Sequence, residues 1–271
     1  MDFKELQDAA IMAAKAAGDV IRKGLVTYSR HDITRKSSTD FVTSVDREAE
    51  SVILAILKDR FPDIPVLAEE SGSSGTSYPY RWIIDPLDGT TNFIHGYPWV
   101  AVSIALERCR EGRPFGDPVV GVILNPFSDQ LFTGYEGHGA FLNGKQIHVS
   151  SIEKLDDALL ATGYPFRNRG ILDEYLDIFK ELFRLCHGIR RAGSAALDFA
   201  WLAAGALDGF WEYGLSPWDM AAGAILIREA GGIVTDFWGG DEWLDTGNIA
   251  AGTPGVHRDI LEVIQRIKGS K

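Results

Sequence analysis

The sequence predicts a mixed α/β (α+β) fold on the strength of two observations. Residues 1–150 begin with two stretches of helical periodicity and continue with short apolar runs that resemble strands. From about residue 150, helical stretches alternate with short strands, as in an α/β unit. No low-complexity tract or long linker divides the 271 residues. We therefore expect one folded unit over residues 1–271, with packed subdomains of approximately 1–150 and 151–271.

The first two elements are predicted to be helices. Apolar residues follow a helical spacing after Asp2, which can cap the first turn, and Gly24 is the expected stop. A second helix is expected after Thr43-Ser44-Val45-Asp46, which resembles a capping box, and it leads to the turn FPDIP. This places Asp46 in the first turn of a helix.

Strands are predicted from Pro65 onward, where apolar runs are separated by Gly, Pro, Asp and Asn. Asn143-Gly144 is the strongest hairpin signal in the chain. In the second half, the helical spacing returns in four segments. The predicted strands are 66–68, 82–84, 100–106, 119–124, 130–135, 233–235 and 249–251, and the later helices are roughly 171–186, 195–205, 219–230 and 256–268.

Charge and composition narrow the classes of partner. The formal net charge of −11 argues against a nucleic acid or an anionic membrane as the default partner. Cys109 and Cys186 have neither the spacing of a zinc site nor a partner pattern for a disulfide framework. The first residues do not resemble a signal peptide, and no apolar run reaches the length of a membrane span. We therefore expect a cytoplasmic protein.

Carboxylates recur where apolar runs end, which is where ligand sites of α/β proteins tend to form. Glu69 follows VLA, Asp85 and Asp88 follow WII, and Asp219 begins a helix. Asp46 and Asp219 can each be explained as an acidic residue that favours a helix N-terminus. Asp85 and Asp88 are harder to explain in that way, because Pro86 stiffens their link and Gly89 permits close approach of the backbone.

Such carboxylates would repel one another unless cations held them together. Ligands that are all oxygen favour Mg²⁺ or Mn²⁺ over zinc or copper, and Mg²⁺ often also binds phosphate oxygens. Gly89-Thr90-Thr91-Asn92 can offer backbone N–H groups to an anion at the start of a helix. The residues themselves therefore predict a hard metal and phosphate chemistry.

Five separated motifs resemble one known family. WIIDPLDGTTNF is similar to the first signature of the inositol monophosphatases, and WDMAAGAILIREAGG is similar to the second. KSSTDFVTSVD, LAEESG and GIRRAGSAAL occur in the expected order, so the resemblance spans essentially the whole chain. It implies the family's sugar phosphatase fold, a layered sandwich of alternating helix and sheet layers.

The resemblance also implies the roles of the carboxylates. Glu69, Asp85 and the Leu87 carbonyl would bind one Mg²⁺, and Asp85, Asp88 and Asp219 would bind a second. Glu69 would also hold a third, weaker ion through waters, and Mn²⁺ would be able to substitute. No protein ligand other than oxygen is implied.

The remaining residues of the site are implied by the same motifs. Thr90 would work with Asp46 and Glu69 to activate a water, which attacks phosphorus directly. Lys36 matches a lysine of the active-site loop. The implied contacts to the phosphate and the alcohol are Asp88, Gly89, Thr90, Gly193, Ser194, Ala195, Glu212 and Asp219.

The implied activity is Mg²⁺-dependent hydrolysis of myo-inositol monophosphate to inositol and phosphate, by a lithium-sensitive homodimer. On the net charge, neither a direct nucleic-acid partner nor a membrane partner is expected. Arg190-Arg191 looks more like prokaryotic members, some of which also hydrolyse fructose 1,6-bisphosphate. A fructose-1,6-bisphosphatase or a dual-specificity sugar phosphatase is therefore an alternative. Histidinol phosphate, a nucleotide phosphate and a regulatory role associated with RNA polymerase are further alternatives. A haloacid-dehalogenase phosphatase is disfavoured, because its D-x-D loop is one residue shorter than Asp85-x-x-Asp88.

Overall fold

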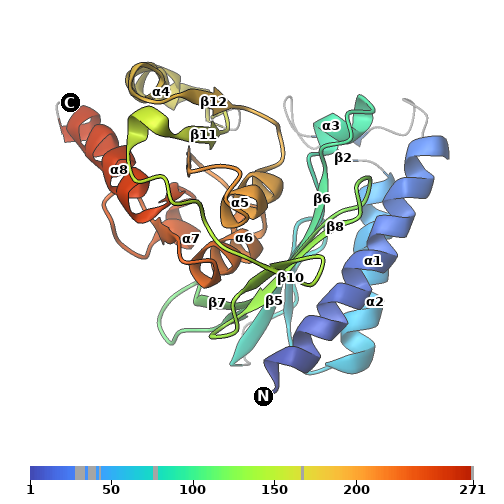
Figure 1. Cartoon of the computed structure of the whole chain (residues 1–271). Coiled ribbons are helices and arrows are strands. Elements are labelled where there is room, and N and C mark those ends of the chain that lie inside the picture. The colour runs from blue at the N-terminus through green and yellow to red at the C-terminus, as the bar shows by residue number, and fades with distance from the viewer. Residues whose placement is uncertain (28–33, 36–40, 43, 76–78, 166–167, 270–271) are drawn as a thin grey trace.

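The computed structural model describes residues 1–27, 34–35, 41–42, 44–75, 79–165 and 168–269. Helix layers and sheets alternate through the molecule (Figure 1). One helix pair covers a large sheet, a second pair separates that sheet from a smaller one, and further helices cover the outer face of the smaller sheet. The layered sandwich that the sequence resemblance implies is confirmed.

The first helix layer consists of α1 (Phe3–Thr27) and α2 (Ser44–Arg60). Asp2 caps α1 as predicted, because its side chain accepts a hydrogen bond from a backbone N–H of the first turn at 2.9 Å. The expected stop at Gly24 is wrong, since α1 continues past it. A Cβ at Gly24 would lie 2.6 Å from Val45 Cγ2, so this glycine permits the close contact between α1 and α2.

The large sheet has eight strands in the order β10-β9-β8-β7-β6-β5-β3-β4. Neighbouring strands are antiparallel except β3 and β5. The predicted hairpin at Asn143-Gly144 is confirmed, with φ angles of 49° and 78°. The strands are β3 Val66–Ala68, β4 Gly72–Ser73, β5 Tyr80–Asp88, β6 Ala101–Arg108, β7 Asp117–Asn125, β8 Gln130–Tyr135, β9 Ala140–Leu142 and β10 Lys145–Ile147.

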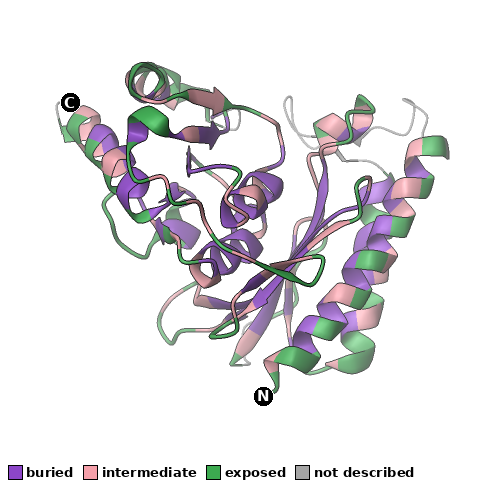
Figure 2. Cartoon of the chain, in the orientation of Figure 1, coloured by how far each residue is buried: buried purple, intermediate pink, exposed green. Residues whose placement is uncertain are grey.

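The central helix layer consists of α5 (Ala195–Ala203) and α6 (Pro217–Glu229), most of whose residues are buried (Figure 2). Helix α6 approaches the large sheet closely because β7 carries Gly121, where a Cβ would lie 2.6 Å from the Ala222 carbonyl oxygen. Apolar side chains of both sheets and both helices form one continuous core around this layer. The start of α6, and Asp219 with it, is therefore fixed against the large sheet.

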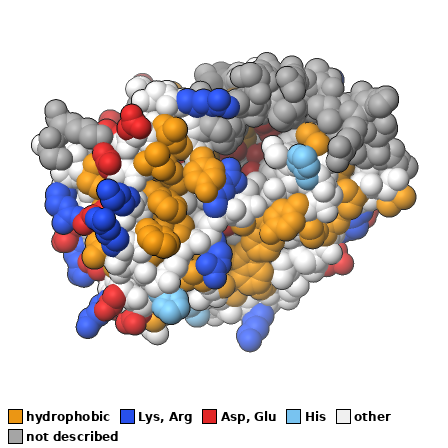
Figure 3. Space-filling view, turned by 90° about the horizontal axis from the view of Figure 1, so that it is seen from above, with side chains coloured by type: hydrophobic (Ala, Val, Ile, Leu, Met, Phe, Trp, Pro, Cys, Tyr) orange, Lys and Arg blue, Asp and Glu red, His pale blue; other side chains and the backbone are white. Residues whose placement is uncertain are grey.

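The smaller sheet has the order β12-β11-β13-β15-β14 and mixes parallel with antiparallel pairs. Helices α4 (Leu172–Leu185) and α8 (Pro254–Gly269) cover its outer face. On α4, the hydrophobic side chains of Leu172, Leu176 and Phe183 are exposed. Figure 3 views the molecule from the side on which α4 lies and shows hydrophobic side chains gathered there.

The remaining elements are short. The four helices and two strands predicted for the second half are all present, with bounds within two residues of those expected. None of the helices within the described ranges has an apolar stretch long enough to cross a membrane. The other elements are β1 Thr34–Arg35, β2 Phe41–Val42, α3 Thr90–Ile94, β11 Leu159–Thr162, β12 Gly188–Arg190, β13 Gly209–Glu212, β14 Ile233–Thr235, α7 Trp243–Thr246, β15 Ile249–Gly252, and 3₁₀ turns at 155–157 and 169–171.

Candidate active site

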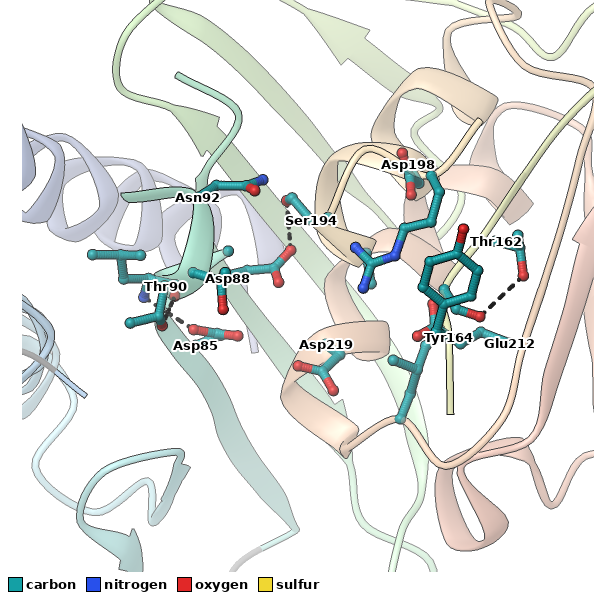
Figure 4. A pocket seen from close by; sticks show the side chains of 18 of the residues that line it. Asp85, Asp88, Thr90, Asn92, Thr162, Tyr164, Ser194, Asp198, Glu212 and Asp219 are labelled. Atoms are coloured by element: carbon teal, nitrogen blue, oxygen red, sulfur yellow. Dashed lines mark hydrogen bonds between the residues drawn. The ribbon is translucent and has the colours of Figure 1, made fainter. Parts of the chain in front are cut away.

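A cavity of about 400 Å³ opens where the end of β5, helix α3 and the starts of α5 and α6 meet (Figure 4). This volume suits a small ligand. Every predicted site residue lines the cavity except Asp46, which lies behind Thr90, and Lys36, which falls outside the described residues. The fold therefore gathers into one place residues that are widely separated in the sequence.

Strand β5 is longer than predicted, so Asp85 lies within the strand rather than after it. Pairing with β6 shifts register between Asp85 and Asp88, which marks a β-bulge at Pro86-Leu87. Pro86 has no N–H to donate, and the Leu87 N–H donates to the Asp85 side chain at 2.9 Å. The bulge leaves both carboxylates at the cavity (Figure 4).

Asp219 joins these two carboxylates from the central helix layer. One carboxylate oxygen from each of Asp85, Asp88 and Asp219 lies within 4.8 Å of the others. Asp219 is held in place by a capping box, in which its Oδ2 accepts a hydrogen bond from the Ser216 N–H at 2.7 Å. Asp219 can therefore act both as part of the helix cap and as a ligand of a cation.

The electrostatics of this carboxylate cluster are unfavourable without a cation. Asp85 is 2% exposed. Burial raises its pKa well above the ordinary value, and repulsion from Glu69, Asp88 and Asp219 raises it further. Glu69 lies beside Asp85 because its backbone N–H donates to the Ile84 carbonyl at 3.1 Å. Four carboxyl groups thus compete for the same small volume.

This donor set fits a hard divalent cation. It offers only oxygen atoms, which Mg²⁺ and Mn²⁺ prefer, and a bound cation would relieve the repulsion that raises the pKa of Asp85. Asp85, Asp88 and Asp219 are the residues that the geometry brings within reach of one ion. Glu69 is close enough to Asp85 to share a hydrogen bond with it.

Thr90 lies next to the carboxylate cluster, at the start of α3. Its hydroxyl lies 3.1 Å from Asp46 Oδ1 and 3.2 Å from the Leu87 carbonyl oxygen, and it can donate to either. Gly89 precedes it with φ of 94°, and a Cβ there would lie 3.0 Å from the Trp99 carbonyl oxygen. Only glycine therefore suits this turn, which brings the Thr90 side chain between the cluster and Asp46.

The opposite wall contains the residues predicted to contact an alcohol. Ser194 caps α5 and donates its hydroxyl proton to Asp88 Oδ2 at 2.6 Å, which ties this wall to the cluster. Gly193 and Ala195 flank Ser194 and line the cavity. Glu212, on β13, is 5% exposed, and burial raises the pKa of its carboxyl group well above the ordinary value.

Six further residues line the cavity that were not predicted from the sequence as part of the site: Thr162, Gly163, Tyr164, Arg191, Asp198 and Leu215. Asp198 is the only charged residue of α5, whose sequence is AALDFAWLA, and it is buried. A single carboxylate in an otherwise apolar helix is a signal that the sequence does contain. Tyr164 and Thr162 carry no comparable signal.

Comparison with known proteins relates the whole chain to one family. A model of the inositol monophosphatase family matches residues 2–268. A protein of Pseudomonas aeruginosa named Nus factor SuhB is 46% identical over 268 residues, which cover 97% of each chain. An inositol-1-monophosphatase of Mesorhizobium japonicum is 43% identical over 262 residues, which cover 96% of each.

Solved structures are similar over the same length. The extragenic suppressor protein suhB of Bartonella henselae has a TM-score of 0.90 at 40% identity, covering 97% of this chain and 99% of that one. The inositol monophosphatase of Anabaena has a TM-score of 0.87 at 40% identity, covering 98% and 97%. The resemblance expected from the five motifs is confirmed. On this agreement of family model, relatives and solved structures, the chain belongs to the inositol monophosphatase family.

Proposed function

We propose that the protein is a Mg²⁺-dependent phosphomonoesterase that hydrolyses inositol 1-phosphate to inositol and phosphate. Its family supports phosphatase activity, and members act on small phosphate substrates with Mg²⁺. The observation that carries the proposal is the convergence of Asp85, Asp88 and Asp219 oxygens within 4.8 Å, beside the hydrogen-bonded pair of Thr90 and Asp46. The proposal thus has two parts, the reaction class, which is hydrolysis of a phosphomonoester, and the identity of the alcohol, which is inositol.

The chain's own residues would divide the reaction between them. We assign Glu69, Asp85, Asp88, Asp219 and the Leu87 carbonyl to metal binding, with two Mg²⁺ ions and a third, weaker one at Glu69. When bound, Mg²⁺ acidifies water and neutralises the charge of the phosphate and the departing oxygen. No phosphorylated aspartate is needed, so none should be trapped on Asp85.

Thr90 and Asp46 would orient the attacking water. The Thr90 hydroxyl can donate to Asp46, a residue that is only 1% exposed and is therefore held in place by its surroundings. That hydrogen bond leaves the Thr90 oxygen able to accept one from a water. Gly89 and Thr90 would receive the phosphate, at the turn where the backbone can approach closely.

The leaving alcohol would lie against the opposite wall. Ser194, Glu212 and the backbone of Gly193 and Ala195 offer donors and acceptors that suit hydroxyl groups. Asp88 would contribute to both sides, since it also accepts the hydroxyl proton of Ser194. These groups favour a polyol over an apolar alcohol.

The direct test is phosphate release from inositol 1-phosphate, fructose 1,6-bisphosphate, glycerol 2-phosphate and histidinol phosphate, with Mg²⁺ titrated. We expect the highest kcat/KM with inositol 1-phosphate and no activity in excess chelator. Preference for another member of the panel would correct the substrate, whereas full activity without a divalent cation would refute the mechanism. Inhibition of phosphate release by lithium is a separate prediction, and it would be measured after the substrate has been identified.

Fructose 1,6-bisphosphate is the second candidate substrate, and one observation weighs against it. Among the described residues that line the cavity, Arg191 is the only Lys or Arg, and two carboxyl groups already lie near it. A second phosphate would need a further cation from this wall. A higher kcat/KM for the bisphosphate than for inositol 1-phosphate would contradict this argument.

A regulatory role, separate from catalysis, is supported by the names of similar proteins. Relatives at 46–47% identity are named Nus factor SuhB, which runs against the expectation of no direct nucleic-acid partner. We therefore propose a regulatory role associated with RNA polymerase as a second function to be tested. Affinity capture of polymerase by wild-type and Asp85→Asn proteins would separate it from catalysis, because only a role independent of the reaction survives that substitution.

The expected homodimer stays a prediction. Sedimentation velocity at two protein concentrations measures it, and a species of 29.8 kDa at both concentrations would contradict it.

A further inference from the structure

Glu50 is a buried carboxylate on α2 that the proposed mechanism does not use. Its residue is 4% exposed, although glutamate is rarely buried unless it has a partner. It lies one helical turn after Asp46, so both side chains belong to the buried face of α2, in the helix layer that covers the large sheet (Figure 1). Burying a carboxylate is costly unless hydrogen bonds compensate for it. The partner of Glu50 therefore indicates what this residue does.

That partner is the backbone of the turn that follows β3. Glu50 Oε2 accepts a hydrogen bond from the Glu70 N–H at 2.9 Å. The preceding N–H, that of Glu69, donates to the Ile84 carbonyl oxygen on β5 at 3.1 Å. The two amides on either side of the Glu69 Cα are thus held by two different elements, α2 and β5. Because peptide groups are planar, fixing both of them also fixes the direction in which the Glu69 side chain leaves the backbone.

The hairpin to which Glu69 belongs gives this turn little support of its own. Strand β3 pairs with β4 at two residue positions, and residues 69–71 form the turn between them. The further hydrogen bonds between Val66 and Ser74 lie at the end of the hairpin away from the turn. Strand β4 is the edge strand of the large sheet, and both of its residues are exposed. Short hairpins are marginally stable in water unless other elements pack against them, so the bond from α2 anchors the turn.

The same face of α2 also holds the other part of the proposed water-activating group. Asp46 Oδ1 lies 3.1 Å from the Thr90 hydroxyl, and Glu50 binds the backbone next to Glu69. Thr90 and Glu69 both line the cavity, although they follow different strands. Helix α2 itself is fixed, because Ala49 and other apolar side chains of this face belong to a continuous core. One rigid helix therefore sets the position of Thr90 relative to Glu69.

We propose that Glu50 is a positioning residue that holds Glu69 in place to bind Mg²⁺. Glu50 does not line the cavity, so it acts through the Glu70 N–H and not by contact with the metal or the substrate. This inference rests on the proposed Mg²⁺-dependent phosphomonoesterase function and adds to it a residue of the helix layer behind the site.

The test compares two substitutions of Glu50. Glu50→Met keeps the length of the side chain but removes the acceptor, whereas Glu50→Gln keeps an oxygen that can accept the Glu70 N–H. The readouts are the Mg²⁺ concentration at half-maximal phosphate release from inositol 1-phosphate and the calorimetric Kd of Mg²⁺ without substrate. In Glu50→Met both should rise about tenfold, as for loss of a hydrogen bond to a charged group. In Glu50→Gln both should stay within about twofold of the wild-type values.

Two further variants separate positioning from other effects. Glu48→Met is the matched control, because Glu48 is exposed on the same helix, and it should leave both readouts unchanged. The double variant Glu50→Met/Glu69→Gln should bind Mg²⁺ no more weakly than Glu69→Gln alone, because Glu50 acts through Glu69. Additive losses in the double variant would overturn the proposal.

A lowered Tm in chelator with unchanged Mg²⁺ affinity in Glu50→Met would show a merely structural role and would also overturn it, as would equal losses in Glu50→Met and Glu50→Gln. Glu50→Asp, which withdraws the acceptor by one methylene, replaces Glu50→Met if that variant does not fold, and unchanged Mg²⁺ affinity in Glu50→Asp would then count against the proposal. If the wild-type protein binds Mg²⁺ but releases no phosphate from inositol 1-phosphate or the other panel substrates, the proposed function fails, and the calorimetric comparison still decides the role of Glu50.

Discussion

Substituting Asp85 by Asn should stabilise the metal-free protein while it disables the reaction. Asn keeps the shape of Asp85 and the oxygen that accepts the Leu87 N–H, so the β-bulge should survive. It removes one charge from a cluster whose oxygens lie within 4.8 Å, where each ionised pair costs about 3 kcal/mol at an effective dielectric constant of about 20. Since burial and repulsion already raise the pKa of Asp85, protonation avoids part of this cost.

We therefore expect a gain of about 2 kcal/mol in the free energy of unfolding without metal, or about 5 °C in Tm. The effect of Mg²⁺ should differ in size between the two proteins. Mg²⁺ should raise the Tm of the wild type by mass action, and this gain should be smaller in the variant. Loss of a ligand that serves two ions should lower kcat/KM by about 10³-fold, which corresponds to about 4 kcal/mol of transition-state stabilisation.

Thermal unfolding in chelator and in saturating Mg²⁺, together with phosphate release from inositol 1-phosphate, measures all three quantities. Asp173→Asn provides a control for loss of a carboxylate outside the site, because Asp173 is exposed in the first turn of α4. A variant that keeps most of its activity at saturating Mg²⁺ would refute the ligand assignment. A variant that melts below the wild type in chelator would refute the electrostatic reasoning.

Three further perturbations test other parts of the site and of the fold. Thr90→Ala removes the hydroxyl next to Asp46 and should lower kcat about 100-fold, with the Mg²⁺ requirement unchanged in a metal titration. A shift in that requirement alone would contradict the role of Thr90. Gly163→Ala places a Cβ that would overlap with the Glu212 carboxylate, so it should displace this carboxylate and raise KM for inositol 1-phosphate, which steady-state kinetics measures. Burial lowers the pKa of His257 to about 4, below its ordinary value of 6.5, so its contribution to stability is present above about pH 6.5 and is lost as pH falls towards 4. His257→Gln should flatten the stability profile in that window, whereas the exposed His95→Gln should not, and equal slopes in the two variants would exclude His257 as the source.

The carboxylate cluster could be predicted from the sequence because each of its residues belongs to a short local motif. Asp85 and Asp88 are three residues apart and flank a proline, and Asp219 belongs to a recognisable helix start. How close these three carboxylates lie to one another could not be predicted from local motifs. It depends on the packing of α6 against the large sheet, which involves residues far apart in the chain.

Asp198, on the opposite wall of the cavity, was harder to predict, because it lies within an apolar helix whose pattern indicates packing. Glu212, which lies in the aromatic-rich strand β13, was expected on this wall through the family resemblance. The error at Gly24 has a related cause. A glycine in a helical pattern predicts a stop when only local conformation is considered, whereas here the missing Cβ makes room for Val45 of a neighbouring helix.

The capping box of α6 has a consequence for how this protein can diversify. Asp219 is fixed by its own helix start, and Asp85 and Asp88 are fixed by a bulge in one strand, so the carboxylates proposed to bind metal depend little on strands β11 and β13. Thr162 and Glu212, which lie on those strands, can therefore change over evolutionary time without loss of the cluster. An enzyme of this lineage could in this way come to accept a substrate with a different alcohol, while the phosphate chemistry is retained.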